Sequence, residues 1–137
     1  MLFGGFFMIT LKNSQMQVEI STYGAELKSI VCDGVEYMWN SDPCVWYRCA
    51  PMCFPICSNL KNNKFTFEGR EYTLEKHGYA NSVDFEVEKC DGASVTLLHR
   101  SNDETRKKYP FDYELRVIYT LSERSLKVDY AVTNTGV

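Results

Sequence analysis

The sequence lacks several features that mark whole classes of protein. It has no apolar run approaching the roughly 18 residues of a membrane-spanning helix. Its first residues also lack the basic region and the cleavage site of a secretory signal. Basic side chains are not in excess, because 15 Lys and Arg residues face 18 Asp and Glu residues. We therefore expect a cytoplasmic protein that binds neither membranes nor nucleic acid, whose phosphates attract strongly basic surfaces.

Motifs for nucleotide binding and for zinc hydrolase chemistry are also missing. The sequence contains no GxGxxG, no Walker glycine loop and no HExxH pair, so these two functions have no support. Histidine is scarce, with only His77 and His99 present. Because histidine titrates near neutral pH, each of the two is a candidate proton-transfer group.

Cysteine, in contrast, is well represented. The six cysteines are Cys32, Cys44, Cys49, Cys53, Cys57 and Cys90. Nothing in the sequence directs secretion, so a disulfide framework is disfavoured. Structural zinc sites usually use C-x2-C pairs, whereas the cysteines from Cys44 to Cys57 are more widely spaced and alternate with Pro51 and Pro55. The pattern favours reduced, buried thiols that act as small hydrophobic groups, and no metal site.

Two long stretches alternate apolar and polar residues. Phe111–Leu121 has an apolar side chain at every odd position, and Leu126–Thr133 repeats the alternation with the opposite parity. A period of two residues is typical of a strand with one buried face. The residues between them, Ser122–Ser125, have the length of a hairpin loop. The two strands should therefore pair antiparallel.

Shorter alternating stretches precede this hairpin and are separated by turn-forming pairs such as Asp33-Gly34 and Asp91-Gly92. They are Phe7–Leu11, Gln17–Ser21, Glu26–Val31, Glu36–Trp39, Lys64–Phe67, Tyr72–Leu74, Asp84–Glu88 and Ser94–His99. No window of ten or more residues has an apolar stripe at helical spacing. The 137 residues therefore predict a single all-β domain, built as an antiparallel sandwich or barrel.

Two segments interrupt the alternation. Asn40–Asn63 contains three of the four prolines and four cysteines, which is too much proline for a central strand and too apolar for a solvated loop. We expect an ordered loop that packs over a sheet face and borders a binding site. The second segment, His99–Lys108, is polar and should connect two strands as a solvated loop.

His77 is the stronger of the two histidine candidates. It is followed by Gly78, which allows a backbone or a ligand to approach closely. His99 ends an apolar strand and should face the polar segment that follows, where a histidine more often has a structural role. Arg106, with the two lysines after it, is the one basic run that could clamp a phosphate. Four aromatic residues could stack on sugar rings, although core positions are more common for them: Trp39, Trp46, Tyr47 and Tyr79.

Seven segments match, in order and spacing, the motifs of one family. They are Ser21–Ile30, Glu36–Asn40, Pro51–Cys57, Phe67–Leu74, Lys76–Ala80, Ser101–Arg106 and Tyr109–Leu115. On these residues the chain resembles the aldose 1-epimerase (galactose mutarotase-like) family, more closely its LacX-like branch. The resemblance implies the N-terminal part of a galactose mutarotase-like antiparallel β-sandwich, incomplete within residues 1–137. The resemblance begins near Met8, so we expect Met1–Phe7 to be an extension that has no function.

The resemblance also implies an isomerase chemistry. Family members bind a free aldose, such as an aldohexose, and interconvert its α and β anomers by acid–base ring opening, without metal or organic cofactor. His77 matches the first of the family's two active-site histidines, which binds and orients the sugar. The family's arginine falls at Asn59, whose amide would hydrogen-bond a sugar hydroxyl instead. Arg106 would supply a basic contact if the sugar carried a phosphate.

The remaining family residues lie outside the resemblance. The second histidine, the sugar-binding aspartate and the glutamate base belong to the second half of family members. General acid–base catalysis needs both groups, each worth about 10²–10⁴-fold, so we expect residues 1–137 alone to have little or no mutarotase activity. Three alternatives stay open: a non-catalytic carbohydrate-binding module, a β-sandwich half that forms homo-oligomers through unpaired strands, and a sugar-phosphate epimerase.

Overall fold

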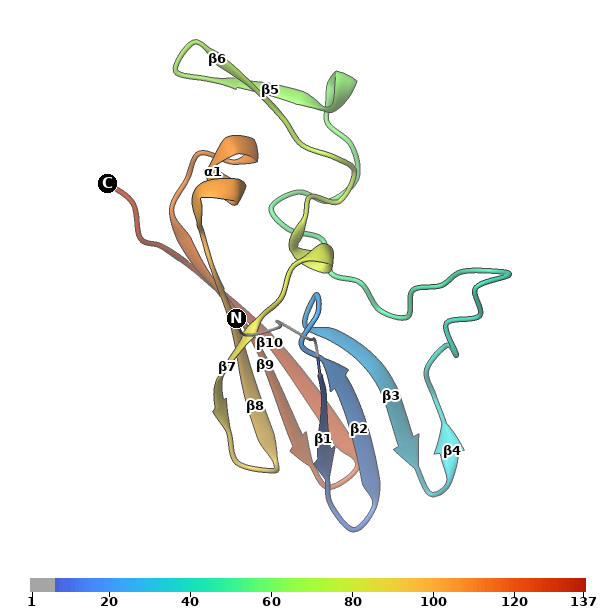
Figure 1. The fold of residues 1–137 in the computed structure, drawn as a ribbon. Helices are drawn as coiled ribbons and strands as arrows, with labels where there is room; N and C mark the ends of the chain where they lie inside the picture. Colours follow the sequence, from blue (N-terminus) through green and yellow to red (C-terminus); the bar gives the residue numbers. More distant parts are fainter. Residues whose placement is uncertain (1–6) are drawn as a thin grey trace, which may run out of the picture.

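A computed structural model describes residues 7–137, which form mainly antiparallel strands (Figure 1). One four-stranded sheet contains, in spatial order, β1 (Met8–Lys12), β2 (Met16–Ser21), β3 (Glu26–Cys32) and β4 (Val35–Glu36). The other has the order β10-β9-β8-β7, with β7 (Glu86–Cys90), β8 (Ser94–Arg100), β9 (Tyr113–Ser122) and β10 (Ser125–Asn134). The predicted antiparallel β architecture is confirmed.

Three short helices and a separate hairpin complete the described fold. The hairpin pairs β5 (Lys64–Phe67) with β6 (Arg70–Thr73). The helices are the 3-10 turns η1 (Lys61–Asn63) and η2 (Ala80–Ser82) and the α-helix α1 (Asp103–Lys108). Figure 1 shows the hairpin and α1 beyond the same end of the two sheets. In the described part of the chain, no helix has the length and apolar character needed to cross a membrane.

The inner faces of the two four-stranded sheets share one buried apolar cluster. Alternate residues of β9 face this cluster, as the period of two predicts. Leu115 and Val117 of β9 and Val18 of β2 are all buried members of this cluster. The hydroxyl of Tyr119 in β9 donates a 2.8 Å hydrogen bond to the carbonyl of Ala25, which precedes β3. Burial of each large apolar side chain contributes roughly 1.5–3 kcal/mol, so this interface dominates the stability.

The hairpin of β9 and β10 pairs antiparallel, as predicted. Ser122 pairs with Ser125, so the turn consists of Glu123 and Arg124. β10 lies at the edge of its sheet, and its residues Tyr130 and Val132 are exposed. The expected formation of homo-oligomers through unpaired strands stays a prediction.

The predicted strand at 36–39 is wrong beyond its first residue. β4 ends at Glu36 because the Glu36 carboxylate turns back and accepts hydrogen bonds from the backbone N–H groups of Ile30 and Met38, both at 2.9 Å. That carboxylate takes the Ile30 donor, which a strand carbonyl would otherwise use. The Tyr37 N–H still donates to the Ile30 carbonyl at 2.9 Å, but the reciprocal bond is missing and the regular ladder ends.

The predicted solvated loop at 99–108 contains the helix α1, which sequence periodicity did not reveal. The Asn102 side chain accepts hydrogen bonds from the N–H groups of Glu104 and Thr105, both at 3.0 Å. The Thr105 hydroxyl in turn accepts the Asn102 N–H at 2.8 Å, which completes a capping box. Acidic residues in the first turn and basic residues in the last turn suit the helix dipole. Six residues are too few to form an apolar stripe, so the capping hydrogen bonds are the main local interactions that stabilise this helix.

The prediction of buried thiols is correct for only two of the six cysteines. Cys32 and Cys49 are buried, whereas the other four are exposed: Cys44, Cys53, Cys57 and Cys90. The segment 40–63 forms no strand. It packs partly buried apolar side chains such as Phe54 and Leu60 against the core, while three of its four cysteines are exposed. Burial raises the pKa of the Cys49 thiol.

His99 is a buried core residue and does not face the polar segment as expected. Its Nδ1 lies 3.1 Å from the Tyr113 hydroxyl, which itself accepts a 3.1 Å hydrogen bond from the Tyr79 hydroxyl. Its ring is also 5.4 Å from the ring of Phe85, centroid to centroid. The ring of His99 is thus tied by one nitrogen to a pair of buried tyrosine hydroxyls and packed against an aromatic side chain. His99 therefore has a structural role.

Burial of His99 predicts a loss of stability in acid. Desolvation lowers its pKa in the folded protein below the unfolded value of about 6.5. The unfolded state therefore binds more protons below about pH 6.5, and the free energy of unfolding should fall by on the order of 1 kcal/mol towards about pH 5. Urea unfolding of the wild type and of His99→Gln, at several pH values between about 6.5 and 5, measures this change in the free energy of unfolding. The difference between the two proteins should shrink in acid, and parallel curves would contradict the assignment.

Candidate functional site

His77 lies in the turn that follows β6, and three hydrogen bonds attach it to the segment 54–58. Its Nδ1 accepts the Ser58 N–H at 3.0 Å, its own N–H donates to the Ser58 carbonyl at 3.0 Å, and its carbonyl accepts the Phe54 N–H at 3.1 Å. Because Nδ1 is an acceptor, the neutral imidazole has its proton on Nε2. His77 thus has a defined orientation and one N–H that can donate to a ligand.

Gly78 allows the close approach that holds His77 in place. A Cβ atom at Gly78 would lie 2.1 Å from the Phe54 carbonyl oxygen, far inside van der Waals contact. The same oxygen accepts hydrogen bonds from the N–H groups of Tyr79 at 2.9 Å and Ala80 at 3.2 Å. The expectation that glycine here serves a close backbone approach is confirmed.

A pocket of about 550 Å³, named the His77 pocket below, surrounds this histidine. Its polar lining residues are Arg48, Glu75, Lys76, His77, Asn81 and Ser82, and its aromatic ones are Trp46 and Tyr47. Donors, acceptors and aromatic faces in one pocket are the groups that recognise a ring with several hydroxyls.

Arg48 is the site residue that the sequence analysis missed. Its Nη1 donates to the Asn81 carbonyl at 2.8 Å and its Nη2 to the Ser82 hydroxyl at 3.1 Å. Its guanidinium also lies 5.4 Å from the centre of the Tyr47 ring. These contacts join the segment 40–63 to η2 across the pocket. The family resemblance places the corresponding arginine at Asn59, and no local sequence pattern distinguishes Arg48 from an ordinary surface arginine.

Glu26 anchors the chain on both sides of Arg48. It is the first residue of β3, is only 4% exposed and lies 3.8 Å from the Arg48 guanidinium. Its Oε1 accepts the N–H groups of Cys49 at 2.7 Å and Ala50 at 3.0 Å. Lys28, 3.4 Å from the same oxygen, adds a second positive charge. A buried carboxylate therefore positions the wall of the His77 pocket.

The four aromatic candidates separate into distinct roles. Trp46 and Tyr47 line the His77 pocket and are exposed. Trp39 is not among the lining residues, but its Nε1 donates to the Trp46 carbonyl at 2.8 Å. Tyr79 is buried in the core and is not accessible to a sugar. Stacking on a sugar ring is thus open to Trp46 and Tyr47.

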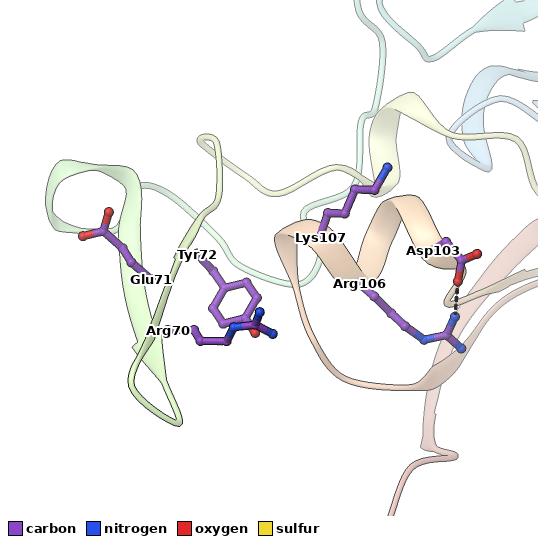
Figure 2. Close-up of a pocket in the computed structure, with 6 residues that line it drawn as sticks. All are labelled: Arg70, Glu71, Tyr72, Asp103, Arg106 and Lys107. Atoms are coloured by element: carbon purple, nitrogen blue, oxygen red, sulfur yellow. Dashed lines mark hydrogen bonds and ion pairs between the residues drawn. The ribbon is translucent and has the colours of Figure 1, made fainter.

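The other predicted site residues do not line the His77 pocket. Asn59 is exposed and follows Ser58, the hydrogen-bond partner of His77, but it is not a lining residue. Arg106 lines a separate pocket of about 430 Å³ between the β5-β6 hairpin and α1, which Figure 2 shows. Its Nη1 donates to Asp103 at 3.0 Å and its Nε to Asp112 at 2.7 Å. The contact of Asn59 with a sugar hydroxyl and the contact of Arg106 with a sugar phosphate stay predictions.

Comparison with known proteins gives consistent matches along nearly the whole chain. Residues 8–137 match the family described as Aldose 1-epimerase. Protein LacX (plasmid) of Lactococcus lactis subsp. lactis is 37% identical over 132 residues, which are 92% of this chain and 44% of that protein. This chain therefore spans less than half the length of that curated relative.

Solved structures extend the comparison to the fold. A galactose mutarotase related enzyme from Lactobacillus acidophilus superposes with a TM-score of 0.92 and 41% identity, over 95% of this chain and 44% of that one. A galactose mutarotase-like protein from Lactobacillus casei ATCC 334 gives a TM-score of 0.91 and 38% identity, over 95% and 45% of the two chains. The fold is thus galactose mutarotase-like and corresponds to part of those structures.

Proposed function

We propose, since this chain belongs to the aldose 1-epimerase family, that the His77 pocket binds a free aldose within a mutarotase site. The observation that carries this proposal is the hydrogen bonding of the His77 ring. Its Nδ1 is taken by the Ser58 N–H, so its Nε2–H is left to donate to a sugar oxygen. The pocket around it combines this donor with acceptors and with two exposed aromatic rings.

The other lining residues have complementary roles in this proposal. The Glu75 carboxylate and the Asn81 side chain supply hydrogen-bonding groups for sugar hydroxyls, and Trp46 and Tyr47 supply faces for the C–H side of the ring. Arg48 already donates to Asn81 and Ser82, so we assign it to positioning these residues.

In this proposal the residues of the His77 pocket bind the sugar but do not by themselves interconvert its anomers. Ring opening needs one group to remove the proton of the anomeric hydroxyl and another to protonate the ring oxygen. Within the described residues His77 is the one histidine that lines the pocket, since His99 is buried in the core. In the proposal, His77 binds and orients the sugar, and residues 1–137 by themselves turn over little or none of it.

Sugar binding is testable by calorimetric titration with galactose and glucose. We expect His77→Ala to weaken aldose affinity by about 5- to 10-fold, the value of one hydrogen bond of about 1–1.5 kcal/mol. Arg106→Ala should leave affinity unchanged, because Arg106 lies in a separate pocket. Equal affinity of wild type and His77→Ala would contradict the proposal, and a loss in Arg106→Ala would move the sugar to the pocket of Figure 2.

Polarimetry on freshly dissolved α-galactose completes this test. The expected result is no acceleration over the spontaneous rate. An acceleration that His77→Ala abolishes would show that this part of the fold suffices for catalysis, and it would overturn the assignment of His77 to binding alone.

A sugar phosphate is the second candidate ligand, and Lys76 is the observation that favours it. Lys76 lines the His77 pocket and forms no ion pair in the described structure. In the same titrations, glucose 6-phosphate should bind more tightly than glucose only if a cation contacts the phosphate, and that advantage should shrink at higher ionic strength.

A further inference from the structure

Two exposed cysteines lie beside the candidate sugar-binding histidine. Cys53, Cys57 and His77 each offer one ligand atom, and these three atoms all lie within 4.8 Å of one another. Among residues 7–137, no other group of three or more His, Cys, Asp or Glu side chains comes as close together. The cluster does not depend on sugar binding, and the proposed function assigns nothing to its two thiols.

The backbone explains why these three residues meet. Phe54 pairs with Gly78 in a parallel bridge, which places Cys53 alongside the turn that carries His77. Four residues after Phe54, the Ser58 N–H donates to His77 Nδ1, so the adjacent Cys57 reaches the same ring. The hydrogen bonds that orient His77 therefore also hold both thiols near it.

We propose that Cys53, Cys57 and His77 bind one zinc-class divalent ion, with water as the fourth ligand. Two thiolates and one imidazole form a ligand set that suits tetrahedral Zn²⁺, and three protein ligands leave one position open. Both thiols must lose their protons to solvent, so binding releases two protons per ion and becomes tighter as the pH rises. Cys53 and His77 line the His77 pocket, so the open position is reached from it.

The geometry also selects the nitrogen that binds. Ligation through Nε2 would place a proton on Nδ1, directly opposite the Ser58 N–H donor. Ligation through Nδ1 replaces that hydrogen bond by a metal bond and leaves the Nε2 proton in place. Nδ1 is therefore the ligand in this proposal. Binding requires the exposed Ser58 N–H to turn to solvent and the three ligand atoms, which lie within 4.8 Å of one another, to close to bonding distance.

Titration of the reduced protein with Co²⁺, which takes the place of Zn²⁺ and absorbs visible light, tests the site without any sugar. We expect one ion per chain, the intense visible bands of tetrahedral cobalt, thiolate-to-cobalt charge transfer in the near ultraviolet, and displacement by Zn²⁺. Cys53→Ser and Cys57→Ser should each weaken binding at least about 10-fold, because loss even of an outer-sphere partner costs about 10–100-fold. His77→Ala should do the same.

Cys44→Ser and Cys90→Ser are the matched controls, since both cysteines are exposed and lie outside the cluster. They should bind Co²⁺ like wild type. Three results would overturn the proposal: absence of the charge-transfer band in wild type, wild-type binding by both Cys53→Ser and Cys57→Ser, or an equal loss in the controls. Failure of aldose binding would leave the metal result unaffected, so the two proposals are judged separately.

Discussion

Replacing Gly78 by alanine should destabilise the protein by about 2–5 kcal/mol. Gly78 has φ +74, a left-handed conformation that costs other residues about 1–2 kcal/mol. The added methyl group would also lie 2.1 Å from the Phe54 carbonyl oxygen. Overpacking of this kind costs a further 1–3 kcal/mol or so. The urea midpoint should fall accordingly with little change in the slope of the transition.

Gly69 provides a closely matched control. It has the same φ of +74, but nothing lies within 4 Å of the position that its Cβ would take. Gly69→Ala should therefore lower the free energy of unfolding only by the cost of the left-handed backbone conformation, about 1–2 kcal/mol. Equal losses in the two variants would mean that the 54–78 contact relaxes without cost, which would contradict the role given to Gly78 in holding His77.

Replacing Glu26 by alanine should lower the free energy of unfolding by about 2–4 kcal/mol. The change removes the acceptor of two backbone N–H groups, those of Cys49 and Ala50, and each unsatisfied donor costs about 1–3 kcal/mol. The charges of Lys28 and Arg48 add less, because both side chains are partly exposed and solvent screens them. Thermal or urea unfolding measures the loss.

Two further variants separate the causes of this loss. Glu26→Gln keeps an acceptor oxygen and should lose only about 1–2 kcal/mol. Glu71→Ala removes an exposed carboxylate that pairs with Lys64 at 2.6 Å, and should cost less than about 1 kcal/mol. If Glu26→Ala were no more destabilising than Glu71→Ala, Glu26 would not be the anchor of the segment that carries Arg48.

The strands and the site could be predicted to different extents. The β9-β10 hairpin could be predicted because alternation is a property of neighbouring residues and the strand backbone. α1 could not, because its six residues form a helix through the side chains of Asn102 and Thr105 and not through an apolar stripe. β4 ends early because one side chain, Glu36, competes with the ladder.

The burial of individual side chains also could not be predicted from the sequence. His99 was expected to face a polar segment, yet it lies between Phe85 and Tyr113. Cysteine is usually buried, yet Cys53 and Cys57 are exposed because the proline-rich segment carries them outside the sheets. Composition sets the preference of a residue type, while the path of the chain sets the environment of a given residue.

What the sequence by itself determined is the class of fold, most of the strands and the family, and it singled out His77 as a candidate site residue. Only the tertiary structure decided which residues join His77: Arg48 and the thiols of Cys53 and Cys57 lie near it, and Arg106 lies in another pocket. The reason is physical. Alternation and turns act over a few residues, but the site is built by contacts between residues 19 to 33 positions apart, such as Ser58 with His77 and Arg48 with Asn81. Such contacts exist only once the chain has folded.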